Sequence, residues 1–150
     1  MSRVDAAAAF FRSGHACSQA VLLAWAPEYG LDAGLAARLA AGFAAGMRQG
    51  DVCGAATGAI MVLGLATCGD ECVTREGRAS VASATETFAE KFCERVGALD
   101  CPEVIGCDLR TPEGRATSLE QSLFATRCAP AVRAAVEILE EMLSAPGAAL

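Results

Sequence analysis

Cysteine is the residue type in this chain that could do chemistry. The 150 residues contain eight cysteines but only one histidine, His15, so neither a His-rich metal site nor a Ser-His-Asp triad can be built. Thiolates bind metals and attack disulfides. The net charge is −6 and no Lys/Arg cluster occurs, so we expect neither nucleic acid nor an anionic membrane as the main partner. The chemistry to explain is sulfur chemistry.

Five of the cysteines share one kind of position. Each falls in a loop or in the first turn of a predicted helix, where unpaired N–H groups and the helix dipole favour the thiolate. These five are Cys17, Cys53, Cys101, Cys107 and Cys128. Thiolates converging from different helices could hold an iron–sulfur cluster or a zinc ion, and they could also form a redox-active disulfide. The absence of any C-x-x-C pair counts against a thioredoxin-like site, a zinc ribbon and a ferredoxin-type run.

The other three cysteines have different settings. Cys68 and Cys72 follow the C-terminal end of a predicted helix, where the dipole disfavours thiolate, so we interpret them as incidental or as a minor second thiol pair. Cys93 falls on the inward side of a long predicted helix, and we expect it in the core.

The elements that must position these thiols are organised around residues 51–70. Between Asp51 and Asp70 the only ionisable side chains are cysteines, and a helix that is apolar all round must be buried. The first two turns after Cys53 have small side chains, so a neighbouring backbone or a compact prosthetic group could approach at Gly54 and Gly58. The segment is nearly long enough to span a bilayer, but its Gly, Ala and Thr content and its acidic ends favour a central helix of a soluble bundle.

The rest of the chain predicts an all-α fold, a single-domain bundle of about six or seven helices over residues 1–150. We expect helices at residues 3–12, 18–26, 73–96 and 111–123, and a last helix that opens at Cys128. Asp32 is a good N-cap for another helix, which Leu35, Leu39 and Phe43 mark. Residues 97–110 should be irregular, and residues 42–50 form a loop with three glycines that leads to Cys53.

The N-terminal segment does not look like a signal peptide. Asp5 interrupts its apolar run and Arg12 ends it, so we expect a cytoplasmic protein. Thiols stay reduced in that compartment, which favours ligands or redox groups over a structural disulfide framework.

Several motifs in order resemble one family of redox proteins, known by its cysteine pattern C, GCAxxG, C, C and related to part of the split-Soret cytochromes. The matching pieces are residues 16–22, 42–47, 52–64, 101, 106–114 and 128–130. The resemblance implies a small helical protein with redox-active cysteines, and the split-Soret relationship favours an iron–sulfur cluster. The family pattern falls on Cys17, Cys53, Cys107 and Cys128, with Cys101 as a further candidate. The chain has no C-x-x-C-H, so we expect no c-type haem.

These observations lead to one main hypothesis and two alternatives. We expect an electron-transfer or redox-accessory protein that binds one cluster, [2Fe–2S], through Cys17, Cys53, Cys128 and either Cys101 or Cys107. Its partner would be another redox protein, and its small-residue faces would suit a homodimer. The first alternative is a thiol–disulfide oxidoreductase in which Cys53 or Cys107 attacks. The second is a non-catalytic interaction module stabilised by zinc.

Overall fold

The computed structural model describes residues 1–144, and this part of the chain is helical with no β-sheet, which confirms the predicted all-α fold. Its α-helices are α1 (Arg3–Arg12), α2 (Cys17–Trp25), α3 (Ala33–Ala41), α4 (Gly54–Thr67), α5 (Arg75–Val96), α6 (Cys101–Ile105), α7 (Pro112–Glu120) and α8 (Ala129–Ser144). Short 3₁₀ turns follow α2, α3 and α4, and a π-helical turn, Phe124–Cys128, leads directly into α8.

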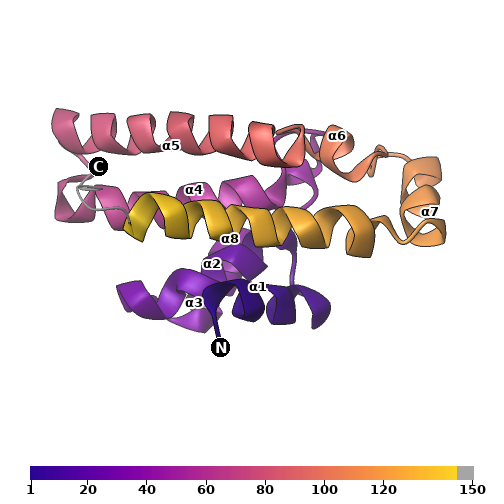
Figure 1. Ribbon diagram of the computed structural model, residues 1–150, viewed down its shortest axis with the longest axis horizontal. Helices are drawn as coiled ribbons and strands as arrows, with labels where there is room; N and C mark the ends of the chain where they lie inside the picture. Colours follow the sequence, from indigo (N-terminus) through magenta and orange to yellow (C-terminus); the bar gives the residue numbers. More distant parts are fainter. Residues whose placement is uncertain (145–150) are drawn as a thin grey trace.

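The predicted central helix is α4. In Figure 1, α5 and α8 lie alongside it, and α1, α2 and α3 form the other side of the molecule. All residues of its first half, Gly54–Ala59, are buried, whereas Leu65 near its end is partly exposed. A Cβ atom at Gly58 would lie 2.6 Å from the carbonyl oxygen of Ser18, so the backbone of α2 occupies the small-residue face at this point. The glycine thus allows close helix packing.

Local sequence explains where most helices begin. Ser2, Asp32, Thr74 and Thr111 are N-caps whose side-chain oxygens accept hydrogen bonds from the third helical residue of α1, α3, α5 and α7. The predicted helix over residues 3–12 agrees with α1, and the expected N-cap role of Asp32 is observed.

The predicted inward position of Cys93 is wrong. Cys93 is exposed on α5, while Ala84, Phe88 and Phe92 are buried. These residues are four apart and form one stripe, and Cys93 is rotated by about 100° from Phe92 around the helix. In α3 the buried residues are likewise Ala36 and Ala40. Leu39, which marks this helix in the sequence, has 55% of its surface exposed.

The segment after α5 is more regular than expected. Asp100 and Pro102 start the short helix α6, which ends at Gly106 in the left-handed conformation. Cys128 is also placed differently from the prediction. It closes the π-helical turn inside a continuous helical run and therefore does not stand at a free helix start.

Cys68 and Cys72 are joined by a disulfide at the C-terminal end of α4. The interpretation of these two cysteines as incidental is therefore wrong. The alternative interpretation, a second thiol pair, agrees with the structure. The bond spans the short turn between α4 and α5, and Cys72 is exposed to solvent. The other six cysteines are free.

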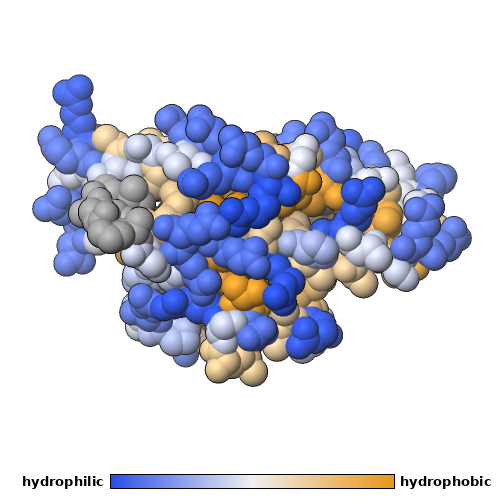
Figure 2. Space-filling model, in the orientation of Figure 1, coloured by the Kyte–Doolittle hydropathy of each residue, from blue (hydrophilic) through white to orange (hydrophobic). Residues whose placement is uncertain are grey.

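The surface is mainly hydrophilic on the face drawn in Figure 2, with apolar side chains visible in the seams between helices. Of the helices within residues 1–144, none is long and apolar enough to cross a membrane.

Candidate functional site: a cavity lined by cysteines

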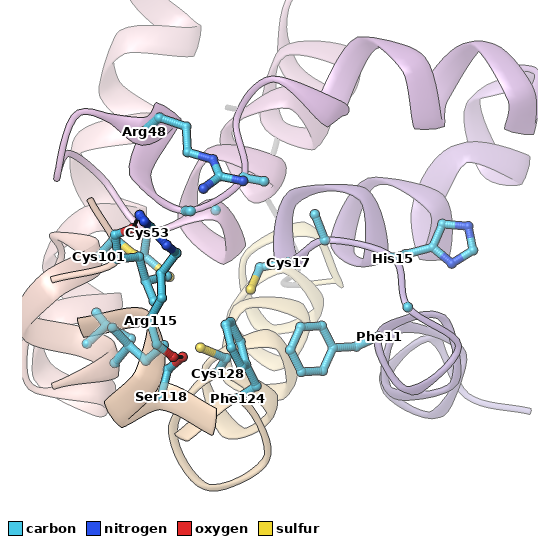
Figure 3. Close-up of a pocket in the computed structure, with 18 of the residues that line it drawn as sticks. Phe11, His15, Cys17, Arg48, Cys53, Cys101, Arg115, Ser118, Phe124 and Cys128 are labelled. Atoms are coloured by element: carbon cyan, nitrogen blue, oxygen red, sulfur yellow. Dashed lines mark hydrogen bonds between the residues drawn. The ribbon is translucent and has the colours of Figure 1, made fainter. Parts of the chain in front are cut away.

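Four of the five predicted site cysteines line one cavity of about 540 Å³. Each comes from a different element: α2, the residue before α4, α6 and the π-helical turn before α8. The four are Cys17, Cys53, Cys101 and Cys128, and we call this space the cysteine cavity (Figure 3). Residues far apart in the sequence therefore meet at one place.

Backbone hydrogen bonds hold Cys53 and Cys101 side by side. The N–H of Cys53 donates to the carbonyl oxygen of Leu99 (2.8 Å), and the N–H of Cys101 donates to the carbonyl oxygen of Asp51 (2.7 Å). Between them Val52 and Asp100 form an isolated antiparallel β-bridge. Both thiols are buried at the points where α4 and α6 begin. This bridge fixes the backbones of two of the four cysteines relative to each other.

Cys17 and Cys128 form the second pair. Figure 3 shows their sulfur atoms turned toward each other from α2 and the π-helical turn. The interaction between the two neighbouring thiols raises the pKa of Cys17 well above its ordinary value and lowers that of Cys128, while burial opposes the shift at Cys128. Of the two thiols, Cys128 therefore loses its proton more readily than Cys17 does.

Burial controls the other two thiols. It raises the pKa of Cys53 to about 11, although the N–H groups of Ala55 and Ala56 at the start of α4 oppose the shift. Burial and the neighbouring thiols raise the pKa of Cys101 to about 12. The helix start therefore acts on Cys53 as the sequence suggested, but desolvation outweighs it and the thiol stays protonated.

Cys107 lies beside the cavity rather than on its wall. It follows α6 in a turn, is partly exposed, and packs against the small apolar cluster of Cys101, Ile105, Leu123 and Cys128. Burial and the nearby Cys128 raise its pKa. Of the two glycines expected near a cofactor, Gly54 lines the cavity close to Cys17, and Gly58 packs against α2.

The loop over residues 42–50 closes one side of the cavity in a strained conformation. Ala45, Met47 and Arg48 have positive φ angles of 54°, 57° and 59°, a region that residues with side chains rarely adopt. Gly46, with φ 62°, lies against the bridge, and a Cβ atom there would be 2.8 Å from the Cβ of Cys101. Only glycine fits this contact.

The sequence gives no distinct signal for several other lining residues. Arg115 and Ser118 face the cavity from α7, and Phe11 and Phe124 flank Cys17 and Cys128 (Figure 3). Their types are ordinary for exposed or apolar helix positions, and only packing of the helices brings them together.

His15 and Arg48 both line the cavity. The Nδ1 of His15 lies 3.0 Å from Ser13 Oγ and 3.2 Å from the Phe10 carbonyl oxygen, so this nitrogen is engaged within its own turn. Arg48 is exposed, and Asp51 supplies its carbonyl oxygen to Cys101.

The residues of the cysteine cavity suit an iron–sulfur cluster or zinc by chemical type. Four cysteine sulfurs are the donor set that both groups take. Within residues 1–144, however, no group of three or more Cys, His, Asp or Glu side chains already has the arrangement of metal ligands. The thiols share a cavity without being set at ligand positions.

The part of the chain that the structure describes is therefore a helical protein in which four cysteines from different elements line one cavity. Residues 15–142 match the family described as "Putative redox-active protein (C_GCAxxG_C_C)". The match covers most of the chain, so the protein belongs to this family, and the resemblance drawn from the sequence is confirmed. Among curated proteins and among solved structures, none matches the chain significantly.

Proposed function

We propose that the cysteine cavity holds an iron–sulfur cluster, [2Fe–2S], with Cys17, Cys53, Cys101 and Cys128 as ligands. The observation that supports this most directly is that four sulfurs from four elements line the same cavity. Cys101 is preferred over Cys107 because Cys107 is not among the lining residues. When bound, the cluster would accept and release single electrons.

The electrostatics of the thiols favour a bound cation. Cys53 and Cys101 each have a raised pKa, partly because neighbouring thiols would repel a negative charge. No carboxylate lines the cavity within the described residues, so none would compete with the thiolates for a bound metal. Metal binding replaces thiol protons and compensates thiolate repulsion. The same thiols are poorly suited to act alone as nucleophiles at neutral pH.

The protein would contribute shielding and hydrogen bonds. Phe11, Ile105 and Leu109 supply apolar walls that limit water access. The N–H groups of Ala55 and Ala56 at the start of α4 act to lower the pKa of Cys53 and would stabilise its thiolate. Both the exclusion of water and the N–H groups are features that set the potential of a cluster.

A cluster of this kind implies a redox protein as partner and a reducing compartment. We therefore retain the cytoplasm as the proposed location. Six of the eight cysteines are free, which fits a compartment in which thiols are kept reduced, and the Cys68–Cys72 disulfide is the exception.

The test is anaerobic purification followed by an absorption spectrum and assays of iron, acid-labile sulfide and zinc. Visible bands with matched iron and sulfide are expected in the wild type and in Cys93→Ser, because Cys93 is exposed and outside the cavity. They should be lost in Cys53→Ser. A colourless protein with stoichiometric zinc would instead identify the zinc-stabilised module, and a protein with neither metal would contradict both metal hypotheses.

The opposite pKa shifts of Cys17 and Cys128 support a second candidate, a thiol–disulfide oxidoreductase. The Cys128 thiolate would attack a disulfide substrate, forming a mixed disulfide and releasing one substrate thiol. Cys17 would then lose its proton, attack the Cys128 sulfur and release the second thiol, leaving a Cys17–Cys128 disulfide. This pair replaces Cys53 and Cys107 as the proposed reactive thiols because Cys17 and Cys128 are in direct contact.

The second candidate predicts that a metal-free protein consumes a model disulfide and gains one intramolecular bond. Peptide mapping should find that bond between Cys17 and Cys128. Cys128→Ser should abolish the consumption, whereas Cys93→Ser should not. Formation of no such bond at any disulfide concentration would exclude this candidate.

A further inference from the structure

Two arginines stand at the opening of the cysteine cavity. Arg48 reaches it from the loop over residues 42–50, and Arg115 reaches it from α7 (Figure 3). Both are exposed, so they define the mouth of the cavity, while Cys53, Cys101 and Cys128 are buried deeper. Among the residues described, neither arginine forms an ion pair, and no Asp or Glu lines the cavity.

The chain holds Arg48 at this point by an unusual backbone. Arg48 and the preceding Met47 both adopt left-handed φ angles, and Gly46 fixes the loop against Cys101. Arg110 ties the same loop from the other side, because its Nη1 donates to the carbonyl oxygen of Gln49 (3.1 Å) while Asp108 binds its guanidinium. Strained residues of this kind often mark a functional constraint.

A hydrogen bond to the backbone also holds Arg115 in place. Its Nη1 donates to the carbonyl oxygen of Leu109 (3.1 Å), which leaves other donors of the guanidinium free of protein partners in the described residues. Leu109, Leu119 and Phe124 are apolar residues that also line the cavity. The cavity therefore combines two exposed guanidinium groups, apolar side chains and buried sulfur atoms.

We propose that the cavity binds a small organic thiol that bears a carboxylate. The carboxylate would bind Arg48 and Arg115, the body of the ligand would contact the apolar wall, and its sulfur would reach the four cysteines. Guanidinium groups bind carboxylates through paired hydrogen bonds. This inference rests on the proposed function only because the same four cysteines line the cavity. It applies to the metal-free protein.

Charge makes the selectivity measurable. The protein has a net charge of −6, so its overall field disfavours anions, and two cations at one mouth reverse this locally.

The metal-free, reduced protein is treated with iodoacetate or iodoacetamide, and alkylation of Cys128 is followed by peptide mass spectrometry. Both reagents attack the same thiolate, so the ratio of their rates reports charge selection and is independent of the thiol pKa.

The iodoacetate-to-iodoacetamide ratio should fall about tenfold at low ionic strength in the double variant Arg48→Gln/Arg115→Gln. It should stay near the wild-type value in Arg48→Lys/Arg115→Lys, which keeps both charges. Arg75→Gln is the matched control, because it removes one positive charge at the start of α5, outside the cavity lining. Equal unfolding midpoints would show that all variants are folded. A ratio that does not respond to the double Gln change would overturn the selection of anions.

The ligand is tested by calorimetric titration of the same protein with glutathione, which has two carboxylates and a thiol, and with cysteamine, a thiol with a cationic amine. Glutathione should bind the wild type, and binding should be lost in the double Gln variant. Absence of glutathione binding, or equal binding of cysteamine, would overturn the proposed ligand class. Because these experiments use metal-free protein, a failure to find iron would not affect them.

Discussion

The backbone N–H of Cys101 donates a 2.7 Å hydrogen bond to the carbonyl oxygen of Asp51. This bond joins two segments separated by all of α4 and α5, and it places Cys101 beside Cys53 without the help of either sulfur. Gly46 packs on the bond: a Cβ atom there would lie 2.6 Å from the Asp51 oxygen.

Gly46→Ala should therefore disturb the site and the fold together. The added methyl group must displace the bridge, and alanine is strained at φ 62°. We expect a loss of about 2–4 kcal/mol in the free energy of unfolding, measured by urea denaturation, and a lower iron content after anaerobic purification. Gly42→Ala, in the same loop, has ordinary φ and open space around its Cβ, so it should change stability by less than about 1 kcal/mol. Equal effects of the two changes would argue against the packing role of Gly46.

The close contact of α4 with α2 makes a second prediction. Gly58→Ala should destabilise the protein by about 1–3 kcal/mol, because the new Cβ would overlap the Ser18 carbonyl group. Gly64→Ala is six residues along the same helix and meets nothing within 4 Å. That change should stabilise the protein by up to about 1 kcal/mol through helix propensity. Chemical denaturation of both variants distinguishes the effect of packing from that of helix propensity, because helix propensity alone predicts that both variants are more stable than the wild type.

The Cys68–Cys72 disulfide gives a third prediction. Without a reductant, the denatured protein should expose six alkylatable thiols, and eight after reduction. The bond closes a loop of five residues, so reduction should lower the free energy of unfolding by about 2 kcal/mol. In Cys68→Ser/Cys72→Ser a phosphine reductant should have no such effect. Eight titratable thiols before reduction would show that the bond does not form.

The raised pKa of Cys53 predicts a loss of stability at alkaline pH. The folded protein holds this proton up to about pH 11, whereas the thiol ordinarily ionises near pH 9.0. The stabilisation is therefore complete below pH 9 and falls as the pH rises toward 11, by up to about 1.4 kcal/mol per pH unit.

Urea denaturation of the metal-free protein at pH 8, 9 and 10 checks this expectation. Cys53→Ala should flatten the decline above pH 9, and Cys93→Ala, at an exposed position, should follow the wild type. A decline with the same slope in all three proteins would assign the pH dependence to other groups.

Sequence patterns predict the helices and the cysteines of the site, but they do not predict which of these cysteines meet. Capping residues and periodicity are local properties, and they suffice for α1, for the start of α3 and for the buried half of α4. The selection of cysteines at helix starts also identifies all four that line the cavity, although Cys128 is in a π-helical turn. The contact between Cys17 and Cys128 could not be predicted, because it depends on how α2 packs against the C-terminal helix.

The predictions that fail have the correct helical spacing of apolar residues but place the wrong face of the helix in the core. Cys93 is next to the buried Phe92, and one residue of rotation takes it to the surface. Leu35 and Leu39 have the helical spacing of a buried stripe, yet the neighbouring alanines pack inward because α2 approaches closely, with Ser18 Oγ donating to the Ala40 carbonyl oxygen (2.7 Å). Size at the interface, rather than hydrophobicity, decides which face is buried.

The helix α4 has sulfur at both of its ends. Cys53 is its N-cap at the cavity, and Cys68 is its C-cap in the disulfide. At 1.5 Å per residue its 14 residues separate the two positions by about 20 Å. The chain thus has two groups of cysteines that are too far apart to react with each other. A thiol count on the whole protein adds the thiols of both groups, and peptide mapping is needed to assign a change to one of them.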